Sequence, residues 1–446
     1  MTAVRRLGSL LLLLLALAAP AHADEVLEAT LDNGLKVLLL EDHRSPVATF
    51  QVWYRVGSRN ERPGLTGLSH LLEHMMFKGT ARYGPGVFAT TIEQLGGQDN
   101  AFTSQDYTAY FVNLAADRLD VVLELEADRV QHLLLDPKAF EAERRVVLEE
   151  RRTRTEDDPV SAMAEELGAI AFRLHPYGLP IIGYKEDIER LTVEDLRAWY
   201  RAYYAPSNAL VVAVGDFNAA ELLEKIRKAF GAIPRGPDPP PVRVVEPGQD
   251  GERRVVVKKQ EARLAFVFMG YLTPNHASPD SFALDLLATI LAAGRSSRLY
   301  QGLVYEQRLA LDAGGDYSFL ASDPDLFTFY ASVLPGKTVE EVERALLAEV
   351  ERLKTEPVTD EELARAKNQI EVGFVFRQDS VFRRAMTLAR FELAGDWRLM
   401  DRYLPGIRAV TPADLLRVAR TYFDPDRRNT GILLPLASHG PAVPDR

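Results

Sequence analysis

The feature that most constrains the fold is an internal repeat between two distant parts of the chain. The segments LTVEDLRAWYRAYYAPSNALVVAVG and VTPADLLRVARTYFDPDRRNTGILL share five residues at one constant offset of 219 positions. The matched pairs are Thr192 and Thr411, Asp195 and Asp414, Leu196 and Leu415, Tyr203 and Tyr422, and Pro206 and Pro425. Each copy predicts a capped helix, an aromatic pair, a proline turn and a hydrophobic strand. The repeat therefore predicts two homologous domains.

A linker rich in proline and glycine lies between the two copies, at residues 234–251 (PRGPDPPPVRVVEPGQDG). Such a composition cannot build a hydrophobic core, so we expect a boundary there. The expected domains are residues 24–233 and residues 252–446.

Strand and helix patterns alternate along the first of these domains. Residues 26–41 alternate apolar and polar side chains around Asp32-Asn33-Gly34, which indicates a β-hairpin. A second strand pattern covers residues 48–56, and helical patterns cover residues 67–76, 87–95, 118–133 and 138–155. Because the strands come in hairpins, we expect an α+β fold in which each domain is a mostly antiparallel sheet packed with helices.

Composition places the chain among globular proteins of ordinary charge. It has 446 residues, 47% of them hydrophobic, and a formal net charge of −11. This negative charge argues against a nucleic-acid partner, which would require a basic face. There is no cysteine, so a metal site would have to use histidine and carboxylate side chains.

The N-terminus has the pattern of a secretory signal peptide. Arg5 and Arg6 precede an apolar run over residues 10–19, and Ala21-His22-Ala23 offers a cleavage site. We expect residues 1–23 to be removed by a cut after Ala23, which implies a periplasmic or secreted protein. An uncleaved anchor is the alternative. The apolar run is about half of what a membrane span needs, and no other stretch approaches that length.

The stretch SHLLEHMMFKGT is the strongest candidate for chemistry. His70 and His74 are four residues apart, so a helix places them on one face with Cβ atoms about 5–6 Å apart. Two imidazoles at this spacing suit one Zn²⁺ ion. Glu73 lies close to the same face and could act as the base that takes a proton from the attacking water.

H-x-x-E-H is the inverted form of the zinc-protease motif H-E-x-x-H. A plain amphipathic helix with incidental histidines is the alternative. The apolar neighbours favour the metal site, because burying two histidines and a glutamate without partners is costly. These neighbours are Leu68, Leu71, Leu72, Met75 and Met76.

A third ligand is expected from the charged helix over residues 138–155. Glu143, Val147 and Glu150 share one face, and Val147 indicates that this face points inward, whereas Glu149 is expected to be solvated. Glu150 is therefore the candidate third ligand, and Glu143 is expected to support a ligand by a hydrogen bond. The other histidines are His22 in the signal segment and five in unremarkable contexts: His43, His132, His175, His276 and His439.

Four segments taken together resemble the pitrilysin family of inverted-motif zinc metallopeptidases. They are HLLEHMMFKGT at residues 70–80, GGQDNAFTSQDYTAY at residues 96–110, VVLEE at residues 146–150 and HPYGLPIIG at residues 175–183. The order and spacing match over nearly the whole mature chain. The length is similar to the two-domain subfamily that contains processing peptidases of the β type and bacterial relatives.

This resemblance implies a zinc endopeptidase whose clam-shell halves close around a peptide in a chamber. It assigns one Zn²⁺ per chain to His70, His74 and Glu150, the general base to Glu73 and a supporting role to Glu143. It also places Asn100 and Ala101 on an edge strand to which a peptide substrate adds by backbone hydrogen bonds. The Gly96-Gly97 pair would allow a close approach of the substrate backbone, although a plain hairpin turn would need the same glycines.

Phe77, next to the metal-binding helix, is a candidate for lining a pocket for an apolar side chain of the substrate. Ordinary core packing explains this phenylalanine equally well.

One departure from the family pattern concerns the second domain. In GRSSRLYQGLVYEQRLALDAG, the family has an Arg and, seven residues later, a Tyr that hold the substrate near the zinc. This chain has Val304 and Leu311 there, and neither side chain can donate a hydrogen bond; Arg298 matches the pattern but is expected to be structural.

In split members of the family a partner supplies the missing pair. We therefore expect a heterodimer with a homologous zinc-less subunit, with a homodimer as the alternative. The competing hypothesis for the function is a non-catalytic scaffold or assembly subunit of the same family.

Overall fold

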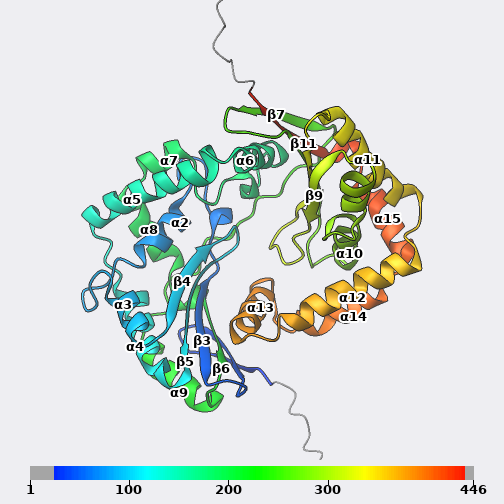
Figure 1. Cartoon of the computed structure of the whole chain (residues 1–446). Coiled ribbons are helices and arrows are strands. Elements are labelled where there is room, and N and C mark those ends of the chain that lie inside the picture. The colour runs from blue at the N-terminus through cyan, green and yellow to red at the C-terminus, as the bar shows by residue number, and fades with distance from the viewer. Residues whose placement is uncertain (1–24, 437–446) are drawn as a thin grey trace, which may run out of the picture.

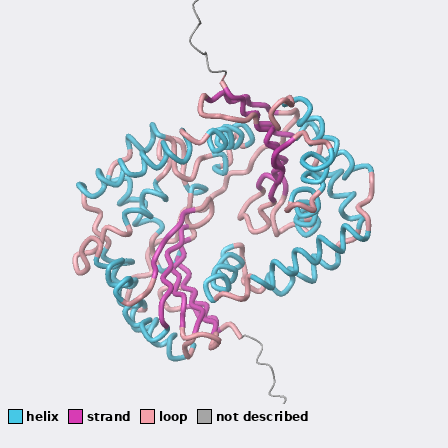
Figure 2. The backbone as a smooth tube through the Cα atoms, in the orientation of Figure 1, coloured by secondary structure: helices cyan, strands magenta, loops and turns pink. Residues whose placement is uncertain are grey.

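The computed structural model describes residues 25–436 and contains two sheets, each covered by helices (Figure 2). The first sheet has six strands in the order β1-β2-β6-β3-β5-β4, and the second has five in the order β7-β11-β8-β10-β9. The predicted α+β fold with two homologous domains is confirmed. The signal segment, the cut after Ala23 and His439 lie outside the described residues.

The strands of the first sheet are β1 (Leu27–Thr30), β2 (Lys36–Glu41), β3 (Val47–Tyr54), β4 (Gln98–Thr103), β5 (Thr108–Ala115) and β6 (Ala209–Gly215). The strands of the second sheet are β7 (Arg253–Lys259), β8 (Phe266–Thr273), β9 (Ala310–Asp316), β10 (Asp325–Val333) and β11 (Arg428–Pro435). The expected hairpin over residues 26–41 corresponds to β1 and β2.

The helices of the first half are α2 (Leu68–Met75), α3 (Val87–Gln94), α4 (Leu119–His132), α5 (Pro137–Arg151), α6 (Pro159–Ala171), α7 (Lys185–Arg190), α8 (Val193–Tyr203) and α9 (Ala219–Phe230). Those of the second half are α10 (Ser281–Ala292), α11 (Val339–Thr355), α12 (Asp360–Phe376), α13 (Val381–Leu393), α14 (Leu399–Ala409) and α15 (Pro412–Tyr422). The helix expected over residues 138–155 ends earlier, at Arg151, and continues as a π-helical turn, η3 (Arg152–Glu156).

The internal repeat appears in the structure as matching topology. Thr192 begins α8 and Thr411 begins α15, each through a capping box with the acidic residue three positions later. The strand after each helix occupies the same place in its sheet. β6 lies parallel to β2 and antiparallel to β3, and β11 lies parallel to β7 and antiparallel to β8. Each mostly antiparallel sheet therefore contains one parallel pair.

Two helices cross between the halves. α13, from the second half, lies against the first sheet, where Leu388 packs in one cluster with Trp53 and Leu210 (Figure 1). In the opposite sense α6, from the first half, lies beside β7 and β11, and Met163 packs with Leu433. Each half therefore completes the hydrophobic core of the other.

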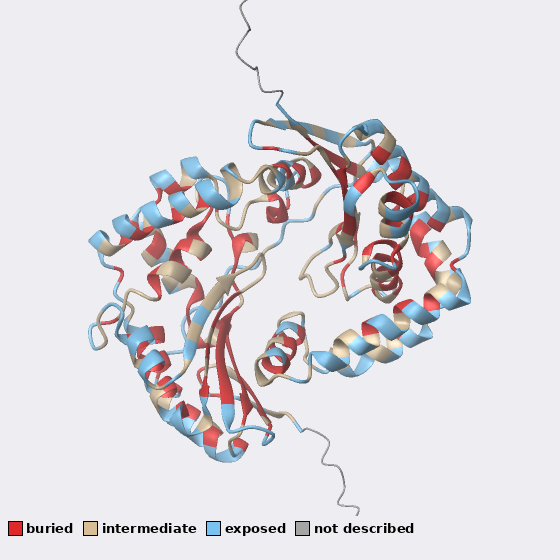
Figure 3. Ribbon diagram, viewed as in Figure 1, coloured by how far each residue is buried: buried red, intermediate tan, exposed pale blue. Residues whose placement is uncertain are grey.

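The first sheet is buried on both faces because of this crossing. All seven residues of β6 are buried, and the central strands appear as buried in Figure 3. One face packs against helices of its own half and the other against α13, which explains the continuous apolar sequence ALVVAVG.

Residues 234–251 contain no helix or strand, as their composition predicts. This segment is nevertheless tied down, because the Glu246 carboxylate accepts hydrogen bonds from the backbone N–H groups of Arg173, Leu174 and His175 at 2.8–3.0 Å. Within residues 25–436, no helix is long and apolar enough to cross a membrane.

Candidate metal centre

Helix α2 carries the two candidate histidines. Leu68, Leu71, Leu72 and Met75 are at most 1% exposed and anchor one face of the helix in the core of the first half. His70 and His74 lie on the adjacent face and are partly buried, with ring centroids 4.8 Å apart. The helical spacing read from the sequence is therefore realised.

Helix α5 carries the candidate carboxylates. It begins at a cap formed by Asp136, whose side chain accepts from the backbone N–H groups of residues 138 and 139, and Pro137 occupies the first turn. Val147 is completely buried and places Glu143 and Glu150 toward α2. Glu149 points to solvent with its side chain 62% exposed, as expected.

Three side chains converge between these helices. Glu150 Oε2 lies 3.3 Å from His74 Nε2 and 3.8 Å from His70 Nε2. One ligand atom from each of the three residues lies within 4.8 Å of the others, and no other such group of His, Asp or Glu occurs in residues 25–436. The structure thus brings together the three residues that the sequence selected.

The chemistry of these donors fits zinc. Two imidazole nitrogens and one carboxylate oxygen are a typical ligand set of catalytic zinc, with a further position left for water or substrate. Burial, followed by the nearby charge of His74, lowers the pKa of His70 to about 3, so its imidazole is neutral and able to donate a lone pair. The buried Nδ1 of His70 has no hydrogen-bond partner in the structure.

Glu143 supports the site from behind His74. Its Oε2 lies 3.3 Å from His74 Nδ1, and its Oε1 forms an ion pair with Lys78 Nζ at 2.5 Å. A carboxylate on the far nitrogen of a ligating imidazole fixes the ring and its tautomer. Lys78 had not been singled out in the sequence, although it lies four residues after His74.

Glu73 faces the end of strand β4. Thr103 Oγ1 donates a 2.5 Å hydrogen bond to Glu73 Oε2. Burial raises the pKa of Glu73, and the bond from Thr103 opposes that shift in part. Thr103 was missed as a functional residue, although it belongs to the quoted segment GGQDNAFTSQDYTAY.

Arg154 is a third residue that the sequence analysis did not identify. It lies in the π-helical turn η3 and forms an ion pair with Glu150 Oε1 at 2.7 Å. This bond holds one carboxylate oxygen and leaves the other facing the two histidines. Arg154 belongs to the charged run RRTRTEDD, in which the sequence alone does not indicate which residues form ion pairs.

The candidate substrate-binding residues lie at the open edge of the first sheet. Strand β4 is the last strand of that sheet and pairs only with β5. Asn100 Oδ1 accepts a 2.8 Å hydrogen bond from the backbone N–H of Ala101. Phe77 is partly buried and packs on the core, with its ring 6.3 Å from that of Tyr110.

The second half brings no hydrogen-bond donor at the two positions that depart from the family pattern. Val304 is half-buried and packs on the second core, while Leu311 is 48% exposed on the edge strand β9. Tyr305 points to solvent with 71% exposure. Arg298 is structural, as expected, because it donates to both oxygens of Glu362 at 2.9 and 3.0 Å.

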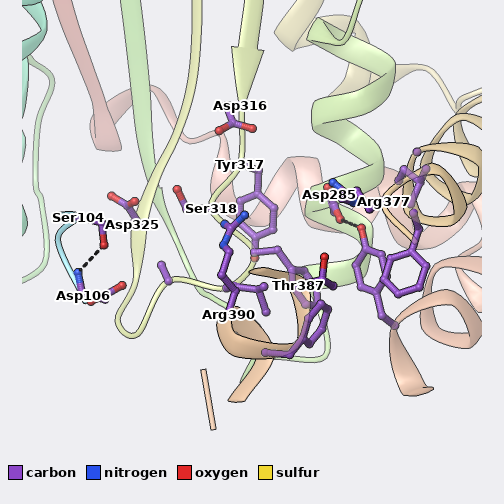
Figure 4. A pocket seen from close by; sticks show the side chains of 18 of the residues that line it. Ser104, Asp106, Asp285, Asp316, Tyr317, Ser318, Asp325, Arg377, Thr387 and Arg390 are labelled. Atoms are coloured by element: carbon purple, nitrogen blue, oxygen red, sulfur yellow. Dashed lines mark hydrogen bonds between the residues drawn. The ribbon is translucent and has the colours of Figure 1, made fainter. Parts of the chain in front are cut away.

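A cavity of about 540 Å³ begins where strand β4 ends. Its wall includes the β4–β5 turn at Ser104 and Asp106, α13 at Arg390, and the second half at Asp285 and Asp316 (Figure 4). Burial raises the pKa of Asp285 to about 6. The cavity therefore lies between the two halves, and none of the three candidate zinc ligands lines it.

Comparison with known proteins identifies the relatives of this fold and site. Residues 36–185 match the family model described as insulinase, peptidase family M16. Residues 190–370 match the model described as the peptidase M16 inactive domain, which covers most of the half without the histidine pair.

Proteins with similar sequences include named zinc proteases. The zinc protease PqqE of Helicobacter pylori is 34% identical over 97% of this chain and 98% of its own. A probable mitochondrial-processing peptidase subunit β of Arabidopsis thaliana is 28% identical over 91% of this chain and 77% of its own. The crystal structure of a protease from H. pylori superimposes with a TM-score of 0.90 at 34% identity, covering 93% of this chain and all of that one.

Proposed function

The chain belongs to the insulinase family of peptidases, M16, and from that premise we propose that it is a zinc-dependent endopeptidase that hydrolyses peptides or unfolded segments. The observation that carries this proposal is the convergence of His70, His74 and Glu150 beside Glu73. His70, His74 and Glu150 would hold one zinc ion. When bound, zinc supplies a Lewis acid that polarises a peptide carbonyl and activates water.

Glu73 is the proposed general base. It lies on α2 one residue before His74, and its carboxylate is close enough to His74 and Glu150 for their charges to affect it. Its raised pKa, caused by burial, makes it a stronger proton acceptor than an exposed glutamate. Thr103 holds one of its oxygens, so the other can accept the proton from water and deliver it to the leaving amine.

The substrate is proposed to bind as an added strand along β4. The N–H of Ala101 bonds to the side chain of Asn100, so this N–H points away from β5 toward the open edge. Because strand residues alternate, Asp99 and Thr103 present their backbone groups to the same edge. A peptide would replace Asn100 Oδ1 with a backbone carbonyl, and it would then run past Thr103 to Glu73.

Such recognition uses main-chain groups and therefore selects for extended peptides more than for a given sequence. The cavity of about 540 Å³ next to the β4–β5 turn offers room for a side chain of the bound peptide. Phe77 contributes to core packing in this structure, and its role as a pocket wall stays a prediction.

We further propose that a homologous, zinc-less partner completes the site. The second half has Val304 and Leu311 at the two positions where the family pattern has hydrogen-bond donors. The relative in A. thaliana is described as a subunit of a peptidase, which supports an active site shared between two polypeptides. A homodimer is the second possibility, and a scaffold without activity is the competing function.

Export to the periplasm or the cell exterior is also proposed, from the signal-peptide pattern of residues 1–23. Mass spectrometry of the protein from its native host tests this. A mature N-terminus at Asp24 is expected, and an intact Met1 on the isolated protein would contradict it.

The test of the enzymatic proposal uses substitutions that separate metal binding from catalysis. Glu73→Gln is expected to retain one zinc per chain and to lose peptidase activity by about 10²-fold or more. Glu150→Gln is expected to lose zinc, whereas Glu149→Gln on the solvent side of the same helix should bind zinc normally. Activity and metal content are measured together, with and without a co-expressed homologous partner.

Three results would contradict the proposal. A wild-type chain that binds no zinc would remove the metal site. A Glu73→Gln chain with full activity would remove Glu73 as the base, and full zinc binding without activity in any partner combination would favour the scaffold.

A further inference from the structure

Helix α2, which carries both candidate histidines, begins without a cap of its own. Its N-cap residue is Gly67, which has a left-handed backbone with φ of 86° and no side chain to accept the first free N–H groups. The first turn contains no acidic residue either. A short helix that must hold two ligands in register therefore depends on a partner from elsewhere in the chain.

Close packing explains why Gly67 cannot be a capping residue. A Cβ atom added to Gly67 would lie 2.7 Å from the carbonyl oxygen of Ile182 and 3.2 Å from the Cα of Gly183. A Cβ added to Gly183 would lie 2.6 Å from the Cα of Gly67. The two backbones touch, so serine, threonine or aspartate is excluded from the N-cap position.

Glu61 supplies the missing cap from six residues upstream. Its two carboxylate oxygens accept the backbone N–H groups of Gly67 and Ser69, each at 2.7 Å. The side chain is 4% exposed, and this burial raises the pKa of Glu61 to about 7, while the bonds from Ser69 and Gly67 oppose that shift. A buried carboxylate at this end also balances the positive end of the helix dipole.

Helix α5, which carries the third candidate ligand, contacts the same backbone segment at Gly183. Arg151, the neighbour of Glu150 on α5, donates a 2.7 Å hydrogen bond to the carbonyl of Gly183 and pairs with Glu165 at 2.8 Å. The Gly67–Gly183 contact therefore joins α2 to α5 through Arg151. The start of α2 and the end of α5 therefore both contact the backbone at Gly183.

We infer that Glu61 is a positioning residue of the metal centre, which sets the rotation and depth of α2 so that His70 and His74 meet Glu150. This inference rests on the proposed zinc site. It concerns Glu61 alone, which lies outside the ligand set and does not contact the metal position. Loss of this cap is expected to loosen the ligand geometry before it unfolds the domain, because the apolar face of α2 stays buried.

The experiment compares Glu61→Gln with Asp187→Asn in the full chain. Glutamine keeps the size of the side chain but removes the charge and turns an amide N–H toward the helix. Asp187 is a matched control, because it accepts from Thr66 Oγ1 at 2.7 Å and from the N–H of Gly64 at 3.0 Å in the preceding loop, not from α2. Zinc affinity is measured by chelator competition, and the visible spectrum of the Co²⁺-substituted protein reports the ligand geometry.

Glu61→Gln is expected to weaken zinc binding about 10- to 100-fold and to change the Co²⁺ spectrum. Asp187→Asn should keep zinc affinity within about threefold of wild type, even if its thermal stability falls. If Glu61→Gln does not fold, Glu61→Asp is measured in the same way, because it keeps the charge but is too short to reach both N–H groups. It too should bind zinc more weakly.

Equal zinc affinity and an equal Co²⁺ spectrum in wild type and the folded Glu61 variant would overturn the inference and leave Glu61 as a structural cap only. Failure of the wild type itself to bind zinc would instead overturn the proposed function, so the two failures are distinct.

Discussion

Thr103 Oγ1 donates a 2.5 Å hydrogen bond to Glu73 Oε2 and so connects the last residue of the edge strand to the proposed base. This bond connects β4, along which the peptide is proposed to bind, to α2, which carries the proposed base. We therefore expect a peptide added along β4 to reach this carboxylate without a further rearrangement.

Removing this bond should slow the reaction without removing the metal. Thr103→Val keeps the shape of the side chain, and a hydrogen bond to a charged group contributes about 1.5–3 kcal/mol. We expect kcat/KM to fall about 10- to 100-fold while zinc content stays unchanged. Thr103→Ser, which retains the hydroxyl, is the control and should keep most of the activity; equal activity of the Val and Ser variants would exclude a role for the bond.

Restoring donors in the second half should reduce the dependence on a partner. Leu311 is exposed on β9, so Leu311→Tyr costs little packing, and Val304→Arg adds the missing charge. The double variant is expected to cleave peptides at least about tenfold faster than the wild-type chain when each is assayed alone. Tyr305→Phe, next to Val304, is the control, because that exposed residue should not affect turnover.

A double variant that folds normally but gains no activity would count against the missing-donor explanation. Thermal unfolding of the variant is measured first, because Val304 is half-buried.

The crossing helices should contribute strongly to stability. Leu388 on α13 and Met163 on α6 are 1% and 0% exposed, and each fills the core of the opposite half. Replacing either by alanine is expected to lower the free energy of unfolding by roughly 2–5 kcal/mol. Val375→Ala, at a site 52% exposed on α12, should change it by less than about 0.5 kcal/mol. Urea unfolding measures all three, and equal stabilities would show that the helices do not complete these cores.

Acid should loosen the contact between the halves. Glu28 pairs with Arg398 at 2.6 Å, and Asp323 lies 3.0 Å from His175 Nε2 and also pairs with Arg59. Hydrogen bonds lower the pKa of Glu28 from 4.5 to about 2, and the bond from Lys36 has the largest effect. Burial raises the pKa of Asp323, but the bonds from His175 and Arg59 outweigh it and lower the value from 3.8 to about 2.

A carboxyl group whose pKa is lower in the folded state stabilises that state at pH values above its unfolded-state pKa. This contribution is lost as the pH falls through its folded-state pKa. Stability from these two groups is therefore present above pH ~4.5 and lost toward pH ~2. After allowance for partial exposure, we expect about 1–2 kcal/mol from each. Urea unfolding between pH 7 and pH 3 should show this loss, and the variant with Glu28→Gln and Asp323→Asn should show a flatter pH dependence; an unchanged slope would contradict the assignment.

Local pattern was sufficient for much of the fold and of the candidate site. The 219-residue repeat predicted two related domains, and the hairpins predicted the α+β class, because both depend on periodicity within short segments. The spacing of His70 and His74 indicated a common face for the same reason. The resemblance of four segments to the pitrilysin family is confirmed by the matches to the M16 models.

Contacts between distant segments could not be predicted in this way. Glu150 was proposed as the third ligand from one helix face, and the family resemblance supported that choice. The packing angle of α2 against α5 cannot be predicted from either helix. Thr103, Arg154 and Lys78 act through partners whose positions depend on the folded chain. The packing of α6 and α13 on the sheets of the opposite halves could not be predicted either, because an amphipathic helix does not specify which sheet it covers.

The sequence by itself determined several elements of the first domain, the repeat, the family and the residue types at the candidate metal centre. Only the tertiary structure decided that Glu61 caps the helix of His70 and His74. It also decided that Arg151, next to Glu150, bonds to Gly183, whose backbone packs on the start of that helix. The physical reason is that periodicity and spacing act within a few turns of the chain, whereas the cap, the contact at Gly183 and the crossing helices depend on which buried surfaces and unpaired backbone groups meet once the chain has folded.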